Sequence, residues 1–159
     1  NYVQRSRVFN KFELEQILSN CRPNHFQSFV QFAYYTGARQ GEIRDLSISN
    51  IFDGYLEVSG KTGKRIIKLN KQAQDILDKQ PKLWNYCRRY VDHTFKKNVR
   101  RMGIRNARFH DLRRTFGYNL ISQGIPIYQV SKLLGHKSVT TTEKHYAPIM
   151  VKDIPEFEL

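Results

Sequence analysis

Two arginines, two histidines and a tyrosine stand in four short strings whose order along the chain indicates phosphoryl-transfer chemistry. TGARQGE surrounds Arg39, HDLRR carries His110 and Arg113, LGH ends at His136, and HY ends at Tyr146. A guanidinium fork matches two phosphate oxygens and stays charged throughout a reaction. A phenol can attack phosphorus if a positive cluster stabilises the phenolate and the charge on the non-bridging oxygens. The set suits the movement of a phosphoryl group on nucleic acid without a metal.

Each string is weak evidence when it is taken alone. His110 and Arg113 are three residues apart at the start of a predicted helix, which suits a phosphate clamp and also suits a structural hydrogen-bond network. His136 follows a glycine at a predicted helix end, where surface loop histidines are ordinary. Tyr146 is one of nine tyrosines, and most tyrosines are half-buried packing residues. The prediction therefore depends on the order of the strings.

A lysine in the turn sequence GKTGK adds a sixth group. Lys61 lies between two predicted strands, where a loop can bring its ammonium to a leaving 5′ oxygen as general acid. Lys64 is the competing candidate, and lysine is also common in hairpin turns without a catalytic role. Metal binding is the rival use of the histidines, but their spacing matches neither zinc fingers nor zincins, so no metal site is predicted.

The composition favours a polyanionic partner. Lysine and arginine number 27 against 14 acidic residues, which gives a formal net charge of +13. Nucleic acid, either DNA or RNA, is the expected partner, although a solvated basic face gives the same balance. A chain of 159 residues can close one core, so a single domain is expected.

The cysteines and the apolar runs bear on the compartment. Cys21 and Cys87 lie far apart without CxxC spacing, which predicts neither a zinc site nor a disulfide framework and fits a reducing cytoplasm. No apolar run approaches the length of a membrane span, so we expect a cytoplasmic protein without a membrane partner.

Hydrophobic periodicity predicts a mainly helical α+β domain with one small antiparallel sheet. Asn10 and Glu13 have capping-box spacing before a first helix, and Gly37 is placed to end a second helix with an apolar, aromatic face. Arg39 then stands at a helix entrance, a position that suits anion binding. Three β-prone stretches follow between residues 51 and 69, separated by glycine-containing turns.

The second half of the chain reads as helices. Asn70 caps one helix, which Pro81 ends, and a segment over 92–102 carries a basic face that suits phosphate contacts or plain solvation. Three further helices are expected over 111–122, 126–135 and 138–148, the last of them ended by Pro148.

Taken together, the strings resemble the C-terminal catalytic domain of the tyrosine recombinase or phage integrase family. TGARQGEI is similar to the first arginine motif of that family, SGKTGK to its β-hairpin lysine, HDLRRTF to its HxxR box, LLGH to the following histidine and TTTEKHYAP to its nucleophile helix. The resemblance covers the chain from the helix before Arg39 to just beyond Tyr146. It implies a tyrosine recombinase catalytic-domain fold with a three-stranded antiparallel sheet.

The resemblance also implies a site-specific DNA recombinase of the integrase type, a DNA-associated protein whose partner is double-stranded DNA. Tyr146 would attack a phosphodiester to form a 3′-phosphotyrosyl bond and release a 5′ hydroxyl, and a 5′ hydroxyl of a second strand would rejoin the backbone. The two arginines would hold the phosphate, Lys61 would protonate the leaving oxygen, and His110 and His136 would assist proton transfer. No cofactor is implied, because the covalent bond conserves the phosphodiester energy.

Two features depart from the pattern of the family. Tyr146 is ten positions beyond His136, one more than is usual, so the usual nucleophile position falls on His145. We prefer Tyr146, because imidazole is not the expected nucleophile. In addition, the N-terminal core-binding domain of family members does not precede the catalytic region, so we interpret 1–8 as the remnant of a linker and 9–148 as the catalytic domain. We expect such a domain to bind DNA weakly and with steep salt dependence.

Residues 149–159 alternate apolar and charged side chains. In relatives such tails dock on a neighbouring protomer, which predicts a homo-oligomer, a tetramer, on DNA and leaves a monomer open for the isolated domain. A frayed terminus or intramolecular packing would give the same pattern.

Two other functions stay open at this point. One is a DNA-binding or regulatory module that has lost catalysis, and the other is a relative of type IB topoisomerases that relaxes DNA. The compact length and the HDLRR and LLGH strings fit recombinases better.

Overall fold

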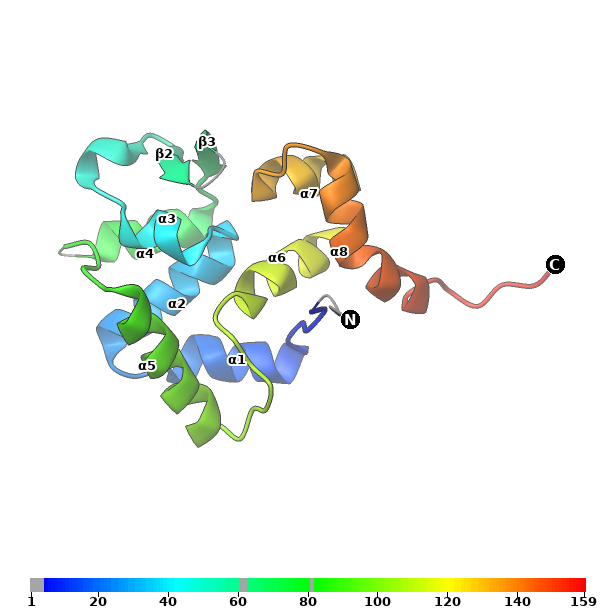
Figure 1. Ribbon diagram of the computed structural model, residues 1–159, viewed down its shortest axis with the longest axis horizontal. Coiled ribbons are helices and arrows are strands. Elements are labelled where there is room, and N and C mark those ends of the chain that lie inside the picture. Colours follow the sequence, from blue (N-terminus) through cyan, green and yellow to red (C-terminus); the bar gives the residue numbers. More distant parts are fainter. Residues whose placement is uncertain (1–4, 61–62, 81) are drawn as a thin grey trace.

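Helix α6 lies between a larger helical group that carries a small sheet and a smaller group formed by α7 and α8 (Figure 1). The structure is a computed structural model that describes residues 5–60, 63–80 and 82–159. Its elements are α1 (Lys11–Asn20), α2 (Asn24–Thr36), α3 (Gln40–Arg44), a 3-10 turn (Ile48–Asn50), β1 (Ile51–Phe52), β2 (Tyr55–Gly60), β3 (Gly63–Lys68), α4 (Lys71–Lys79), α5 (Arg88–Arg101), α6 (Asp111–Ser122), α7 (Ile127–Leu134) and α8 (Val139–Lys152).

Helix α2 supplies the centre of the larger core. Phe26, Phe29 and Val30 are fully buried, and α1, α4 and α6 pack against this helix. The prediction that its aromatic residues are core is confirmed. Gly37 ends α2 in the left-handed conformation with φ of 67°, and a Cβ at that position would stand 2.3 Å from the ring of Phe116. The close approach of α6 to this helix end therefore depends on glycine.

The sheet has the order β1-β2-β3, and both pairings are antiparallel, as the three β-prone stretches predicted. Leu56, Val58 and Ile67 form its buried face, and Val58 lies opposite Arg65. Because side chains alternate along a strand, the side chain of Arg65 lies on that same inner face. Lys61, the predicted lysine of the turn, lies outside the described residues.

A buried carboxylate fixes the start of α6. Asp111 is 0% exposed and accepts hydrogen bonds from Arg5 Nε at 2.8 Å, from Arg114 Nη1 at 2.8 Å and from the backbone N–H of Arg108 at 2.8 Å. The last bond closes the turn that leads into His110, and the first ties the N-terminal segment to it. The segment that sequence analysis interpreted as a linker remnant thus packs, from residue 5 onward, against the HDLRR helix.

The predicted end of the last helix at Pro148 is wrong, because α8 continues to Lys152 with that proline inside it. Proline removes one backbone donor but fixes φ near the helical value, so an exposed helix can lose one hydrogen bond and continue. Helix α5 likewise begins at Arg88, ahead of the predicted start at residue 92. The helix boundaries set by Asn10, Asn70, Gly135 and Ser138 are as predicted. None of the described helices is long and apolar enough to cross a membrane.

Candidate active site

Two helix ends hold Arg113 in place. Its Nη1 donates to the carbonyl oxygen of Gly37 at 2.7 Å, and its Nη2 donates to the carbonyl oxygen of Leu134. These carbonyls end α2 and α7, where the helix dipole favours a cation. The residue is 5% exposed, and burial together with the charges of Arg39 and Arg65 lowers its pKa to about 9. Arg113 is still charged at neutral pH.

Arg39 stands at the entrance of α3, as sequence analysis predicted. It is the N-cap residue, and its backbone N–H donates to Glu42 Oε1 at 2.7 Å. Its side chain is 29% exposed and lines the same groove as His110. Burial and the charge of Arg65 lower the pKa of its guanidinium, whereas the charge of Glu42 raises it.

An ion pair between Glu42 and Arg65, which was not predicted from the sequence, underlies this entrance. Arg65 Nε lies 2.7 Å from Glu42 Oε2, and Nη2 lies 2.8 Å from Oε1. Burial raises the pKa of the Glu42 carboxyl, yet the hydrogen bonds and charge of Arg65 outweigh burial and hold that pKa below its usual range. The available signals were the i,i+3 capping spacing of Glu42 and the inward register of Arg65 on its strand.

The two histidines flank the arginines and are neutral at pH 7. Burial, then the charges of Arg113, Arg114 and Arg39, lower the pKa of His110 to about 4, although the residue keeps an exposed edge on the groove. Burial, then the charge of Arg113, lowers the pKa of His136 to about 4 as well. Neutral imidazoles can donate one proton and accept another, which suits proton transfer at a phosphate.

A buried hydroxyl orients His136. Its Nδ1 lies 2.6 Å from Oγ1 of Thr142, which is fully buried on α8. This hydrogen bond fixes the ring and leaves Nε2 as the atom for other partners. The ring of His145 stacks at 5.7 Å from that of His136. In this register of α8, the residue at the usual nucleophile spacing therefore faces the histidine.

Tyr146 is docked against α6. Its side chain is 2% exposed, and a Cβ at Gly117 would stand 2.1 Å from its hydroxyl oxygen. Burial raises the pKa of Tyr146 to about 12, while the charges of Arg113 and Arg114 act in the opposite direction. The phenol is thus protonated at neutral pH, and it lies within electrostatic range of the arginine pair.

Four of the six predicted site residues therefore converge through space from three parts of the chain. Arg39, His110, Arg113 and His136 each perturb, or are perturbed by, the charge of another member of the set. Tyr146 lies next to this cluster on α8, and Lys61 falls outside the described residues. Lys64, the competing lysine, is exposed on β3 opposite Ser59.

A basic groove of about 1460 Å³ runs from the cluster along α3 and α5. Among the described residues that line it, seven are arginine or lysine and three are acidic: Arg39, Arg44, Arg88, Lys96, Arg100, Arg105 and Arg108 against Glu42, Asp45 and Asp92. The basic residues predicted on α5 do not all face the groove. Lys96 and Arg100 line it, whereas Arg101 donates a hydrogen bond to the carbonyl oxygen of Asn20. Within the described ranges, no group of three or more His, Cys, Asp or Glu could hold a metal ion.

The depressed pKa values of the two histidines predict an acid-sensitive fold. The ordinary pKa of histidine is 6.5, and the pKa of His110 and of His136 in the folded chain is about 4. Between these two pH values, both histidines bind protons in the unfolded chain and stay unprotonated in the folded chain. The free energy of unfolding should therefore fall as the pH falls through this window. Urea denaturation at a series of pH values measures this slope.

The variant with both His110→Gln and His136→Gln should lose most of that slope, whereas His93→Gln, a change at an exposed histidine on α5, should keep it. An equal slope in the wild type and the double variant would show that other groups cause the acid sensitivity.

Comparison with known proteins agrees with this geometry. The sequence profile of the phage integrase family matches residues 7–151. Tyrosine recombinase XerD of Listeria monocytogenes is 27% identical over 180 residues, which cover 93% of this chain and 61% of that protein. The chain spans 47% to 61% of the length of the curated relatives that match 93% of it.

Solved structures share the fold. The catalytic domain of bacteriophage HP1 integrase superposes with a TM-score of 0.75 at 20% identity, covering 94% of this chain and 93% of that domain. Lambda integrase, solved as a tetramer bound to a Holliday junction, superposes with a TM-score of 0.73 at 24% identity. The superposition covers 88% of this chain and 49% of the lambda integrase chain. The predicted α+β fold with a three-stranded sheet is confirmed. The profile match and the shared fold show that this chain belongs to the phage integrase family, as its motifs predicted.

Proposed function

We propose that this chain is the catalytic domain of a site-specific DNA recombinase, with residues 9–148 as its catalytic body. The observation that carries the proposal is the convergence of Arg39, Arg113 and two neutral histidines beside the helix that bears Tyr146. Two members of this cluster, Arg39 and His110, line the basic groove. Family membership supports the same reaction class. Each residue role below is part of the proposal.

In the proposed reaction, the hydroxyl oxygen of Tyr146 attacks the scissile phosphorus and the bond to the 5′ oxygen breaks. The phenolic proton passes to a neighbouring base, and the leaving 5′ oxygen takes a proton from Lys61. A 3′-phosphotyrosyl bond and a free 5′ hydroxyl result, and a 5′ hydroxyl of a second strand reverses the step. His110 and His136, neutral at pH 7, suit the transfer of protons.

The arginines would stabilise the charge that develops on the phosphate. Arg113 is pre-oriented by two carbonyls, so it needs no rearrangement when the phosphate arrives. Arg39 lines the groove, and its side chain is partly exposed there. No metal or nucleotide is required in this scheme, because the tyrosyl bond conserves the energy of the phosphodiester.

DNA would lie in the basic groove, which extends the positive surface from the cluster along α3 and α5. Its cations suit contacts to backbone phosphates, which position a duplex without reading its sequence. The solved lambda integrase, a relative in fold, is bound to a Holliday junction, which supports DNA as the partner here.

A second candidate function has one observation in its favour. Tyr146 is almost fully buried, and the residue that faces His136 is His145. A domain fixed in this arrangement would bind DNA without cleaving it. The catalytic proposal requires that the phenol leaves its packing against Gly117 when DNA is bound.

Covalent trapping separates these two functions. Incubation with a nicked suicide duplex that carries the recombination site should give a protein–DNA adduct on a denaturing gel. Tyr146→Phe should abolish the adduct, because the nucleophilic oxygen is gone, while Tyr128→Phe, a matched change at a tyrosine exposed on α7, should retain it. An adduct that survives in Tyr146→Phe would place the nucleophile elsewhere, and a DNA complex without an adduct would favour the binding module.

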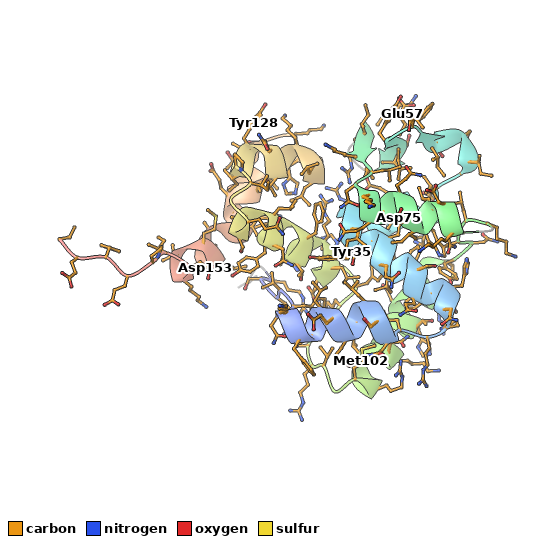
Figure 2. All side chains as sticks on the ribbon, turned by 180° about the vertical axis from the view of Figure 1, so that it is seen from behind. Tyr35, Glu57, Asp75, Met102, Tyr128 and Asp153 are labelled. Atoms are coloured by element: carbon orange, nitrogen blue, oxygen red, sulfur yellow. The ribbon has the colours of Figure 1, made fainter. Side chains whose placement is uncertain are left out.

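We also propose that the C-terminal tail docks on a neighbouring protomer in a tetramer on DNA. The described tail leaves the body beyond Asp153, and Ile154 and Phe157 are 56% and 71% exposed (Figures 1 and 2). Its acidic residues suit docking on a chain whose net charge is +13. The tetrameric assembly of lambda integrase supports the proposal.

Removal of residues 154–159 tests this docking. The truncated chain should keep adduct formation on a suicide duplex and lose the synaptic complex in a native gel, because the anchors between protomers are gone. Alanine in place of Tyr128, an exposed apolar residue on α7, serves as the control. Synapsis that is unchanged by the truncation would contradict the docking.

A further inference from the structure

We propose that Arg65 is a positioning residue that keeps Arg39 available for the phosphate by occupying the carboxylate of Glu42. The inference rests on the proposed function, because it concerns the role of Arg39 as a phosphate ligand. It adds a residue that none of the five motifs assigns a role.

The carboxylate of Glu42 is filled by partners other than the guanidinium of Arg39. Oε1 accepts from the backbone N–H of Arg39 at 2.7 Å and from Arg65 Nη2 at 2.8 Å, and Oε2 accepts from Arg65 Nε at 2.7 Å. The side chains of Glu42 and Arg65 are 2% and 9% exposed. The pair is therefore a two-bond fork that is shielded from competing water.

Arg39 lies just outside this fork. Its Nη1 is 3.8 Å from Oε2 of Glu42, a distance within ion-pair range and beyond hydrogen-bond range. Within the described part of the chain, that nitrogen is buried without a hydrogen-bond partner. A small rotation would close a direct pair between Arg39 and Glu42, and Arg65 opposes this closure because it holds both oxygens and repels the second guanidinium.

Loss of Arg65 would remove this protection. A buried carboxylate that loses its partner is strongly unfavourable, so it recruits the nearest cation. Here the nearest cation is Arg39, at 3.8 Å. A closed pair would turn the guanidinium away from the groove and neutralise the charge that the phosphate needs.

Arg65 also reaches the turn that presents His136. Its Nη1 donates to the carbonyl oxygen of Leu133 at 3.2 Å, and a Cβ at Gly135 would stand 2.5 Å from its Cδ. One side chain of β3 thus spans the arginine entrance and the histidine turn. Lysine cannot replace it, because a single ammonium lacks the fork that holds two oxygens while a third bond is made.

The structure of Arg65→Gln provides a test that does not depend on activity. We expect Arg39 and Glu42 to move from 3.8 Å into direct hydrogen-bond contact. The double variant with Arg65→Gln and Glu42→Gln should keep the two side chains apart, because a neutral amide does not recruit the arginine. It also removes the unpaired buried charge, so it stays informative if Arg65→Gln alone does not fold. A separation that is unchanged in the single variant would overturn the proposal.

Adduct formation on the suicide duplex gives the second readout. Arg65→Gln should slow the single-turnover rate by about 100-fold, as expected when a phosphate ligand is misplaced. The double variant should recover at least about 10-fold of that loss, while Arg65→Lys should stay slow. Lys68→Gln, a change at an exposed cation on the same strand, is the matched control and should match the wild type.

The outcomes separate the inference from the proposed function. A wild type that forms no adduct would count against the function, while the structures would still decide the role of Arg65. A double variant as slow as the single variant would show that Arg65 acts by supporting the fold, and the proposal would fall.

Discussion

Like charges held at close quarters are the constraint on which this site depends. Burial, and then the charges of Arg39 and Arg65, lower the pKa of Arg113. The charge of Arg65 also acts to lower the pKa of Arg39, and burial strengthens the repulsion among the three cations. One buried carboxylate, Glu42, and two helix-end carbonyls offset that repulsion. A site that must bind an anionic phosphate is thus assembled from cations that would separate if these acceptors were removed.

The fold brings those acceptors together. The ends of α2 and α7 converge on Arg113, and each end is closed by a left-handed glycine, Gly37 and Gly135. Phe116 of α6 occupies the space beside Gly37, and Arg65 occupies the space beside Gly135. A side chain at either glycine would push the helix end away from the arginine. Burial, and then the charges of the same arginines, lower the pKa of both histidines, so the positive cluster helps to keep the imidazoles neutral.

Sequence patterns predicted the elements that carry the site more readily than the contacts that hold it. Capping residues and glycines such as Asn70 and Gly37 act on residues within one turn of the helix, so their effect can be predicted from the neighbouring sequence. The pairing of Glu42 with Arg65 depends on the register of β3 against β2, which no local pattern reports. The prediction that α8 ends at Pro148 was wrong for a physical reason. A proline breaks a helix through steric clash and the loss of one hydrogen bond, and an exposed helix end tolerates both. The orientation of α8, which buries Tyr146 and turns His145 inward, was equally out of reach because it depends on packing against Gly117.

The central claim is that buried arginines compensate the negative charge of a phosphate, and one substrate exchange tests it directly. Arg39→Ala is the suitable variant, because this side chain is partly exposed and makes fewer structural bonds than Arg113. On ordinary DNA, we expect it to slow adduct formation by about 100-fold, the usual scale for one lost donor to a developing oxyanion. On the same duplex with an uncharged methylphosphonate at the cleavage position, the wild type and the variant should differ far less, because the charge that Arg39 meets is absent. An equal loss on both substrates would contradict the claim and assign Arg39 a role in the fold.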